Sequence, residues 1–265
     1  MLWILERDTY GAGSHPLEAA VKAAGYRLRS WDDAWARETP PKFEGGVLFH
    51  GSLGVAAEIA ERGQWAPGAF CNRAAFRCSR WYPAAARWLL HDDCLATTVR
   101  ALSADPIPVA GALADASGAV FVRPDCPLKP FSGRVVQLEG LTPASLDHGF
   151  YYDDLDEPIV VSRTQALGAE WRFVVCEGVV VTGCQYEADG RQAVAASVLP
   201  AALALAQQIA RAFTPPDPVF VLDLVHSDAG LKLLEINPFS GADLYACDHE
   251  KIVATVGAFV TDGRG

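Results

Sequence analysis

The sequence predicts an α+β protein in which a small parallel α/β lobe precedes a larger part built mainly from antiparallel strands. The first 85 or so residues alternate short apolar runs with helical patterns, an order typical of parallel strands joined by helices. From about Ala119 the chain is rich in strand patterns. Its length of 265 residues exceeds the usual size of one core, so we expect two or three lobes, with one long sandwich as the alternative.

Composition and charge exclude several classes of protein. With 51% hydrophobic and 20% charged residues, the chain is expected to fold. A formal charge of −10 argues against a nucleic-acid partner, which needs clustered Lys and Arg. No apolar run spans a bilayer and no signal peptide is evident, so we expect a cytoplasmic protein without a membrane partner. The seven cysteines lack a CxxC pair, which favours buried thiols over disulfides or a zinc site.

The elements of the first lobe follow in order. The runs LWILE and GVLFH predict strands, and the segments HPLEAAVKAAGY and LGVAAEIAER predict helices. Gly51-Ser52 lies between a strand and a helix, where backbone N–H groups either bind an anion or simply make a turn. Residues 83–102 have a helical pattern. A dinucleotide fingerprint is excluded, because Pro16 stands where its third glycine should be.

The strand-rich part contains one long helix and a hairpin. The helix LPAALALAQQIARAF is expected to pack on a sheet through a stripe of apolar residues: Leu199, Leu203, Ala206, Ala210 and Phe213. FVLDLVH and LKLLEIN are separated by SDAG, which is typical of a β-hairpin. If the loop has three residues and ends at a left-handed Gly230, Ser227 pairs with Leu231. That register places Asp223 opposite Glu235.

Three polar side chains of this hairpin are expected to form one patch. Because side chains alternate between faces, Asn237 shares the face of Glu235. Two carboxylates roughly 5 Å apart destabilise a hairpin unless a cation lies between them. Oxygen ligands without His or Cys favour Mg²⁺, so we predict that Asp223, Glu235 and Asn237 bind it. The alternative is that both carboxylates face water.

Basic residues lie upstream. Arg123 stands at a predicted strand end, and Lys129 lies in a loop with Ser132 and Gly133 before the next strand. Such a loop suits a flap over a polyphosphate, whereas ordinary solvated surface residues are the alternative. Neither a P-loop nor a kinase, serine-hydrolase or zinc-protease motif is present.

The strand EWRFVV presents an acid and a base on one face. Glu170 and Arg172 are two residues apart, so both side chains point the same way, and a structural ion pair is the alternative to a functional role. The order of parts resembles the ATP-grasp superfamily, in particular its short members named for two arginines and a lysine. The similarity covers about Ala119 to Tyr245, and LLEINPFSGADLY is its most specific piece.

The resemblance implies an ATP site. It implies that Arg123 and Lys129 contact the ATP phosphates beneath a flap that includes Ser132 and Gly133. Residues 159–162 resemble the hinge between the two ATP-grasp subdomains, and the backbone of this segment usually recognises adenine. The resemblance assigns the remaining positions as follows: hinge residues Val160, Val161 and Ser162, ribose-binding Glu170, and magnesium ligands Asp223, Glu235 and Asn237.

One position departs from the family pattern. Many relatives carry an arginine two residues before the first metal-binding acid, where it stabilises the charged acyl intermediate, whereas this chain has Val221. Arg172, on a strand that could lie alongside, is the candidate for that role. The expected catalytic set is therefore Arg172, Lys129 and Arg123.

The resemblance also implies an activity and a domain layout. We expect residues 1–85 to form the N-terminal lobe and 86–265 the ATP-grasp domain. The expected enzyme is a ligase that uses ATP and Mg²⁺ to join a carboxylate, on a small molecule or peptide, to an amine through an acyl phosphate. A phosphotransferase on the same scaffold and a non-catalytic nucleotide-binding or interaction protein are the alternatives. A homodimer is a reasonable expectation for a soluble enzyme.

Overall fold

The computed structural model describes residues 1–11, 13–38 and 40–263. The chain divides into two compact units, one formed by Met1–Asn72 with Leu167–Gly265 and the other by Arg73–Ala166. Both units mix helices with sheets, and the two larger sheet regions after residue 90 are antiparallel, as the sequence predicts. None of the helices in the described ranges is long and apolar enough to cross a bilayer.

The N-terminal part of unit 1 is a four-stranded parallel sheet of strand order β2-β1-β3-β4. Its central strands β1 and β3 are buried along their whole length, which explains their unbroken apolar sequences. The short strand β2, which is mostly exposed, escaped the sequence analysis because its residues Arg-Leu-Arg-Ser show no apolar run. The elements are β1 Leu2–Leu5, α1 Glu18–Ala23, β2 Arg27–Ser30, α2 Ala34–Arg37, β3 Val47–His50, α3 Leu53–Arg62 and β4 Pro67–Gly68.

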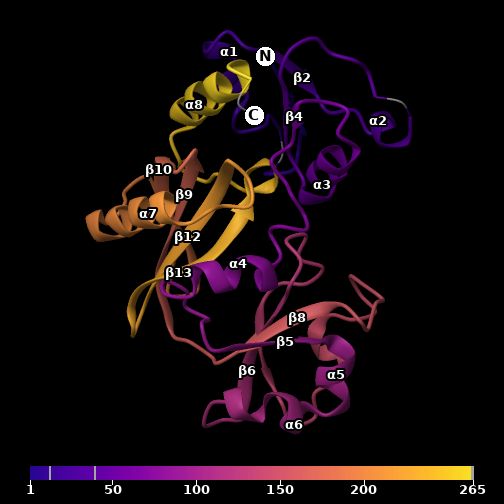
Figure 1. Cartoon of the computed structure of the whole chain (residues 1–265), viewed down its shortest axis with the longest axis vertical. Coiled ribbons are helices and arrows are strands. Elements are labelled where there is room, and N and C mark those ends of the chain that lie inside the picture. Colours follow the sequence, from indigo (N-terminus) through magenta and orange to yellow (C-terminus); the bar gives the residue numbers. More distant parts are fainter. Residues whose placement is uncertain (12, 39, 264–265) are drawn as a thin grey trace. The chain divides into compact units, whose positions relative to one another are not determined.

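The rest of unit 1 is a five-stranded antiparallel sheet of order β11-β10-β9-β12-β13 (Figure 1). One apolar core joins it to the N-terminal sheet and to α8, with Trp3, Leu48, Val174, Val221 and Phe259 among its members. The elements are β9 Leu167–Cys176, β10 Val179–Ala188, β11 Arg191–Ala195, α7 Pro200–Ala212, β12 Val219–Ser227, β13 Gly230–Pro238, the 3-10 turn η3 Phe239–Gly241 and α8 His249–Thr261.

The buried face of α7 differs from the expected stripe. Leu199 and Leu203 are 43% and 41% exposed, so the prediction was wrong for these two residues. The face that packs on the sheet instead follows the smaller Ala202 and Ala206, then Ile209. The helix begins with Pro200 directly after Leu199, and its close approach to the sheet uses alanines rather than leucines.

Unit 2 is a four-stranded antiparallel sheet of order β5-β8-β6-β7, with α5 and α6 beside it (Figure 1). The helix expected over residues 83–102 was wrong: α4 ends at Ala85 and Cys94–Thr98 form β5, which pairs with β8. The elements are α4 Cys78–Ala85, β5 Cys94–Thr98, α5 Val99–Ala104, α6 Pro106–Ala110, η1 Gly111–Leu113, β6 Ala119–Pro124, β7 Arg134–Gln137, η2 Pro143–Leu146 and β8 Pro158–Ser162.

Candidate active site

The hairpin of β12 and β13 places the predicted carboxylates opposite each other. Asp223 pairs with Glu235, as expected. The pairing at the loop was wrong, because Ser227 pairs with Gly230 and not with Leu231. The register shifts after Asp223, where Leu224 pairs with Leu233 and leaves one extra residue in β13. This β-bulge compensates for the shorter loop and restores the expected register at the carboxylates.

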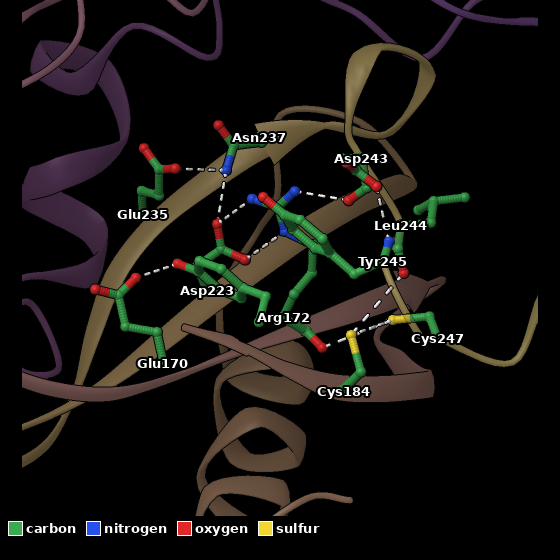
Figure 2. A network of polar contacts seen from close by, with 11 residues as sticks. Glu170, Arg172, Cys184, Asp223, Glu235, Asn237, Asp243, Leu244, Tyr245 and Cys247 are labelled. Atoms are coloured by element: carbon green, nitrogen blue, oxygen red, sulfur yellow. Dashed lines mark hydrogen bonds and ion pairs between the residues drawn. The ribbon is translucent and has the colours of Figure 1, made fainter. Parts of the chain in front are cut away.

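The three predicted metal-binding side chains converge on one patch (Figure 2). Asn237 Nδ2 donates to Asp223 Oδ2 and to Glu235 Oε1, both at 3.0 Å. The amide group therefore lies between two carboxylates and offsets part of their repulsion. Asp223 is fully buried, so the alternative in which both acids face water is excluded for this residue.

Arg172 lies beside this patch on the neighbouring strand. Its Cα partner on β12 is Asp223, and its Nε and Nη2 donate to the two oxygens of that carboxylate at 2.9 and 2.7 Å. Its Nη1 donates to the carbonyl of Asp243 at 2.7 Å. Burial opposes the charged guanidinium, but the attraction of Asp223 outweighs it and holds the pKa of Arg172 well above its ordinary value.

Two tyrosines that the sequence analysis missed hold the guanidinium in place. The rings of Tyr186 and Tyr245 lie 5.2 and 5.1 Å from the Arg172 guanidinium, within the range of cation–π attraction. Tyr245 has a φ of +44°, which a bulky side chain rarely adopts, and its N–H donates to Asp243 Oδ1 at 2.8 Å. Tyr245 closes the motif quoted above, but only the strand pairing shows that it reaches Arg172.

Glu170 shares the face of Arg172 but has a different partner. Its carboxylate accepts a hydrogen bond from the Tyr186 hydroxyl, whereas Arg172 pairs with Asp223. Burial raises the pKa of Glu170 to about 7, opposed by the Tyr186 hydrogen bond and reinforced by the negative charges of neighbouring acids. Glu170 is therefore an acid that titrates near neutral pH at the edge of the patch.

The donor set of the patch fits a hard cation. All the available ligands are oxygens, and Figure 2 shows the Asn237 oxygen directed away from both carboxylates. Both oxygens of Asp223 lie in the patch and accept hydrogen bonds from Arg172 and Asn237, and Glu235 is only half-buried. Within the described ranges no cluster of three or more His, Cys, Asp or Glu side chains could hold a metal, and here the third ligand is an amide.

The other predicted residues belong to unit 2 and lie on or beside one sheet. Arg123 is on β6, next to Val160 of β8. Lys129 lies in the loop between β6 and β7 with a φ of +51°. Ser132 and Gly133 precede β7, and a Cβ added to Gly133 would lie 2.7 Å from the Phe121 ring, so the loop lies close to β6.

The expected hinge segment is a strand. Val160 and Val161 are buried in β8, whose backbone pairs with β5 on one side and β6 on the other. Ser162 ends this strand, and its hydroxyl lies 2.8 Å from His91 Nδ1. The chain passes from unit 2 to unit 1 directly after β8, between Ala166 and Leu167.

The comparisons with known proteins identify the family. Residues 90–255 match the model of an ATP-grasp domain, described as the second family of the clade named for two arginines and a lysine. Because the match covers more than half of the chain, the protein belongs to the ATP-grasp superfamily and, within it, to that family. The resemblance and the fold class expected from the sequence are thus confirmed. No curated protein matches the sequence.

Solved structures share the fold over nearly the whole chain. The D-cycloserine synthetase DcsG has a TM-score of 0.65 at 14% identity, and the match covers 98% of this chain and 100% of that one. The ATP-grasp ligase PsnB with a minimal precursor gives 0.57 at 13%, covering 97% and 98%. The D-alanine–D-alanine ligase from Bacillus anthracis gives 0.55 at 12%, covering 98% and 93%. At these identities the likeness concerns the fold alone.

Proposed function

We propose that the protein is an ATP-dependent carboxylate–amine ligase that forms an amide or peptide bond through an acyl phosphate and releases ADP and phosphate. The observation that carries the proposal is the buried Arg172 fixed beside the oxygen patch of Asp223, Glu235 and Asn237. Membership of the ATP-grasp superfamily and the ligases among the structural neighbours support it.

The phosphates and the metal are assigned to two groups of residues. Asp223, Glu235 and Asn237 would hold Mg²⁺, which when bound neutralises charge on the phosphates. Arg123 and Lys129 would contact the phosphates, with Ser132 and Gly133 in the loop that covers them.

The nucleoside is assigned to two further segments. Because the backbone of β8 is paired on both sides, the groups left for adenine are those at its carboxyl end, from Ser162 onward, after Val160 and Val161. Glu170 would accept from the ribose hydroxyls.

The reaction requires no protein nucleophile. A substrate carboxylate oxygen attacks the γ-phosphorus of ATP, the bond to the ADP oxygen breaks, and an acyl phosphate forms. The amine nitrogen then attacks the acyl carbon, phosphate leaves with its C–O bond electrons, and one amine proton leaves with it. Phosphoryl transfer of this kind depends mostly on positioning and charge stabilisation.

Arg172 is proposed to stabilise the charge that develops on the acyl group. A guanidinium has five N–H donors, of which two bind Asp223 and one binds the Asp243 carbonyl. The remaining donors are available for a substrate oxygen. A donor that is held rigidly before the reaction begins is an effective stabiliser of a transition state.

ATP turnover with Mg²⁺ tests the proposal. The purified protein is given ATP with pooled amino acids and small peptides, and ADP plus phosphate is separated from AMP plus pyrophosphate. We expect ADP and phosphate that depend on both a carboxylate and an amine, and that fall at least 100-fold in Asp223→Ala and Glu235→Ala. Asp228→Ala is the matched control, because Asp228 is exposed at the tip of the same hairpin.

Two outcomes would overturn the ligase. A lasting phosphorylated product that needs no amine would indicate a phosphotransferase. Tight nucleotide binding without turnover across the pools would indicate a nucleotide-binding protein.

A further inference from the structure

A cavity lies at one edge of the N-terminal parallel sheet. Strands β1 and β2 end at Leu5 and Ser30, and a cavity of about 790 Å³ opens directly after them. In open α/β sheets ligands bind outside the carboxyl ends of the strands. The volume is in the range of sites for small molecules. No role has been assigned above to the residues that line this cavity.

Two arginines of the cavity have unused hydrogen-bond donors. Arg7 follows β1 and Arg29 belongs to β2, and neither guanidinium forms a hydrogen bond or ion pair with any residue that the structure describes. A second cavity of about 190 Å³ shares both residues. Two adjacent guanidiniums with free donors suit a carboxylate, which each can bind through two parallel N–H groups.

The other walls are aromatic or acidic. Trp31 and Trp35 line the cavity with their rings 5.6 Å apart in an edge-to-face arrangement, which provides an apolar surface. Asp32 and Asp33 also line it, but their carboxylates accept hydrogen bonds from the Ala34 N–H and the Trp31 indole at 2.9 and 3.0 Å. The acids therefore support the local turn, and the arginines remain for a ligand.

Glu6 connects the cavity with the site around Arg172. Glu6 lines the cavity, and its Oε2 accepts the Ser52 N–H at 2.5 Å. Burial raises the pKa of Tyr10, the charges of Asp243 and Glu6 raise it further, and Arg172 lowers it. All three charged groups therefore lie within electrostatic reach of one hydroxyl, so the end of the cavity marked by Glu6 faces the candidate active site.

We infer that this cavity holds the acceptor substrate, an α-amino acid or short peptide whose free carboxylate pairs with Arg7 and Arg29 and whose amine lies toward Glu6. This inference rests on the proposed function. The carboxylate in the cavity is not the one that becomes activated. The amine nitrogen forms the C–N bond described above, and the apolar part of the acceptor packs on Trp31 and Trp35.

Calorimetric binding without ATP tests the inference. The probes are the twenty L-amino acids and a set of Ala-X dipeptides, each compared with its carboxyl-terminal amide. We expect at least one free acid to bind, its amide to bind at least tenfold more weakly, and Arg7→Gln and Arg29→Gln each to weaken the acid at least tenfold. Binding should also change the tryptophan fluorescence.

Two controls separate this inference from the proposed function. Arg37→Gln, an exposed residue of α2 outside the cavity, should leave acceptor binding unchanged, and Mg-ATP affinity should be unchanged in all three variants. Absence of binding by any free acid, equal binding of acid and amide, or unchanged affinity in Arg29→Gln would overturn the inference. Acid binding without amide formation would instead contradict the ligase and leave the cavity assignment standing.

Discussion

At the scale of single residues, the pair of Arg172 and Asp223 governs the candidate site. The Asp223 carboxylate is fully buried and Arg172 is 7% exposed, so each charge depends on the other. Removing one partner of a buried pair leaves the other charge without compensation in a medium of low dielectric. The two residues therefore contribute to folding as well as to the proposed chemistry.

We predict that Arg172→Met lowers the free energy of unfolding by about 3–5 kcal/mol, because Asp223 is left as a buried unpaired charge. Urea denaturation measures the change. The double variant Arg172→Met/Asp223→Asn should lose less stability than the sum of the two single variants. Arg191→Met, an exposed substitution on β11, is the control and should change stability by less than about 0.5 kcal/mol. Additive effects of Arg172 and Asp223 would contradict the account.

At the scale of elements, the hairpin shows how far alternation alone can predict a site. The sequence pattern predicted the facing of Asp223 and Glu235, and the structure confirms it. The pattern missed both the pairing of Ser227 with Gly230 and the bulge, because neither changes the order of polar and apolar residues. The position of a bulge depends on how both neighbouring strands pair, which a single segment does not encode.

Other elements failed for related physical reasons. The expected helix over residues 83–102 contains β5, because pairing with the buried strand β8 overrides the local helical pattern of Cys94–Thr98. Tyr186 and Tyr245 escaped notice because they meet Arg172 through tertiary packing alone. Residues whose roles follow from one strand or hairpin were predictable, whereas those joined by strands distant in sequence were not.

We predict that Gly230→Ala destabilises the protein by about 1 kcal/mol without changing its affinity for Mg-nucleotide. Gly230 has a φ of +85°, a conformation that strains any residue with a Cβ, whereas the carboxylates lie on the far side of the bulge. Thermal unfolding and calorimetry measure the two quantities. Gly54→Ala in α3 is the matched control: its Cβ meets no atom within 4 Å, so it should stabilise by about 0.5–1 kcal/mol. A large loss of nucleotide affinity in Gly230→Ala would contradict this view.

At the scale of the whole molecule, the N-terminal lobe shares one core with the five-stranded sheet and α8. Buried histidines stand within this unit: His15 Nε2 lies 3.1 Å from His50 Nδ1, and His15 Nδ1 accepts the Leu17 N–H at 3.1 Å. The division expected at residue 85 remains a prediction. Contacts group the described chain differently, since residues 1–72 associate with the C-terminal part.

We predict that stability falls as the pH drops from about 6.5 to 4. Burial, reinforced by His249 and opposed by Glu18, lowers the pKa of His15 from 6.5 to about 4. His15 is therefore neutral in the folded state while the unfolded chain takes up a proton, so its contribution is complete above pH 6.5 and is lost toward pH 4. The loss attributable to His15 is up to about 3 kcal/mol.

Urea denaturation at several pH values measures this slope. His15→Asn should flatten it, and His226→Asn, at an exposed position of β12, should leave it unchanged. A slope of equal size in wild type and His15→Asn would assign the acid sensitivity to other groups.

The most direct test of the central claim is the affinity for ADP, measured by calorimetry with Mg²⁺ and again with the metal chelated. If Asp223, Glu235 and Asn237 form the metal site, wild-type protein should bind ADP at least tenfold more tightly with Mg²⁺, and Glu235→Gln should lose that advantage while Asp228→Asn keeps it. Equal affinity with and without Mg²⁺, or an unchanged Mg²⁺ effect in Glu235→Gln, would contradict the assignment of this patch.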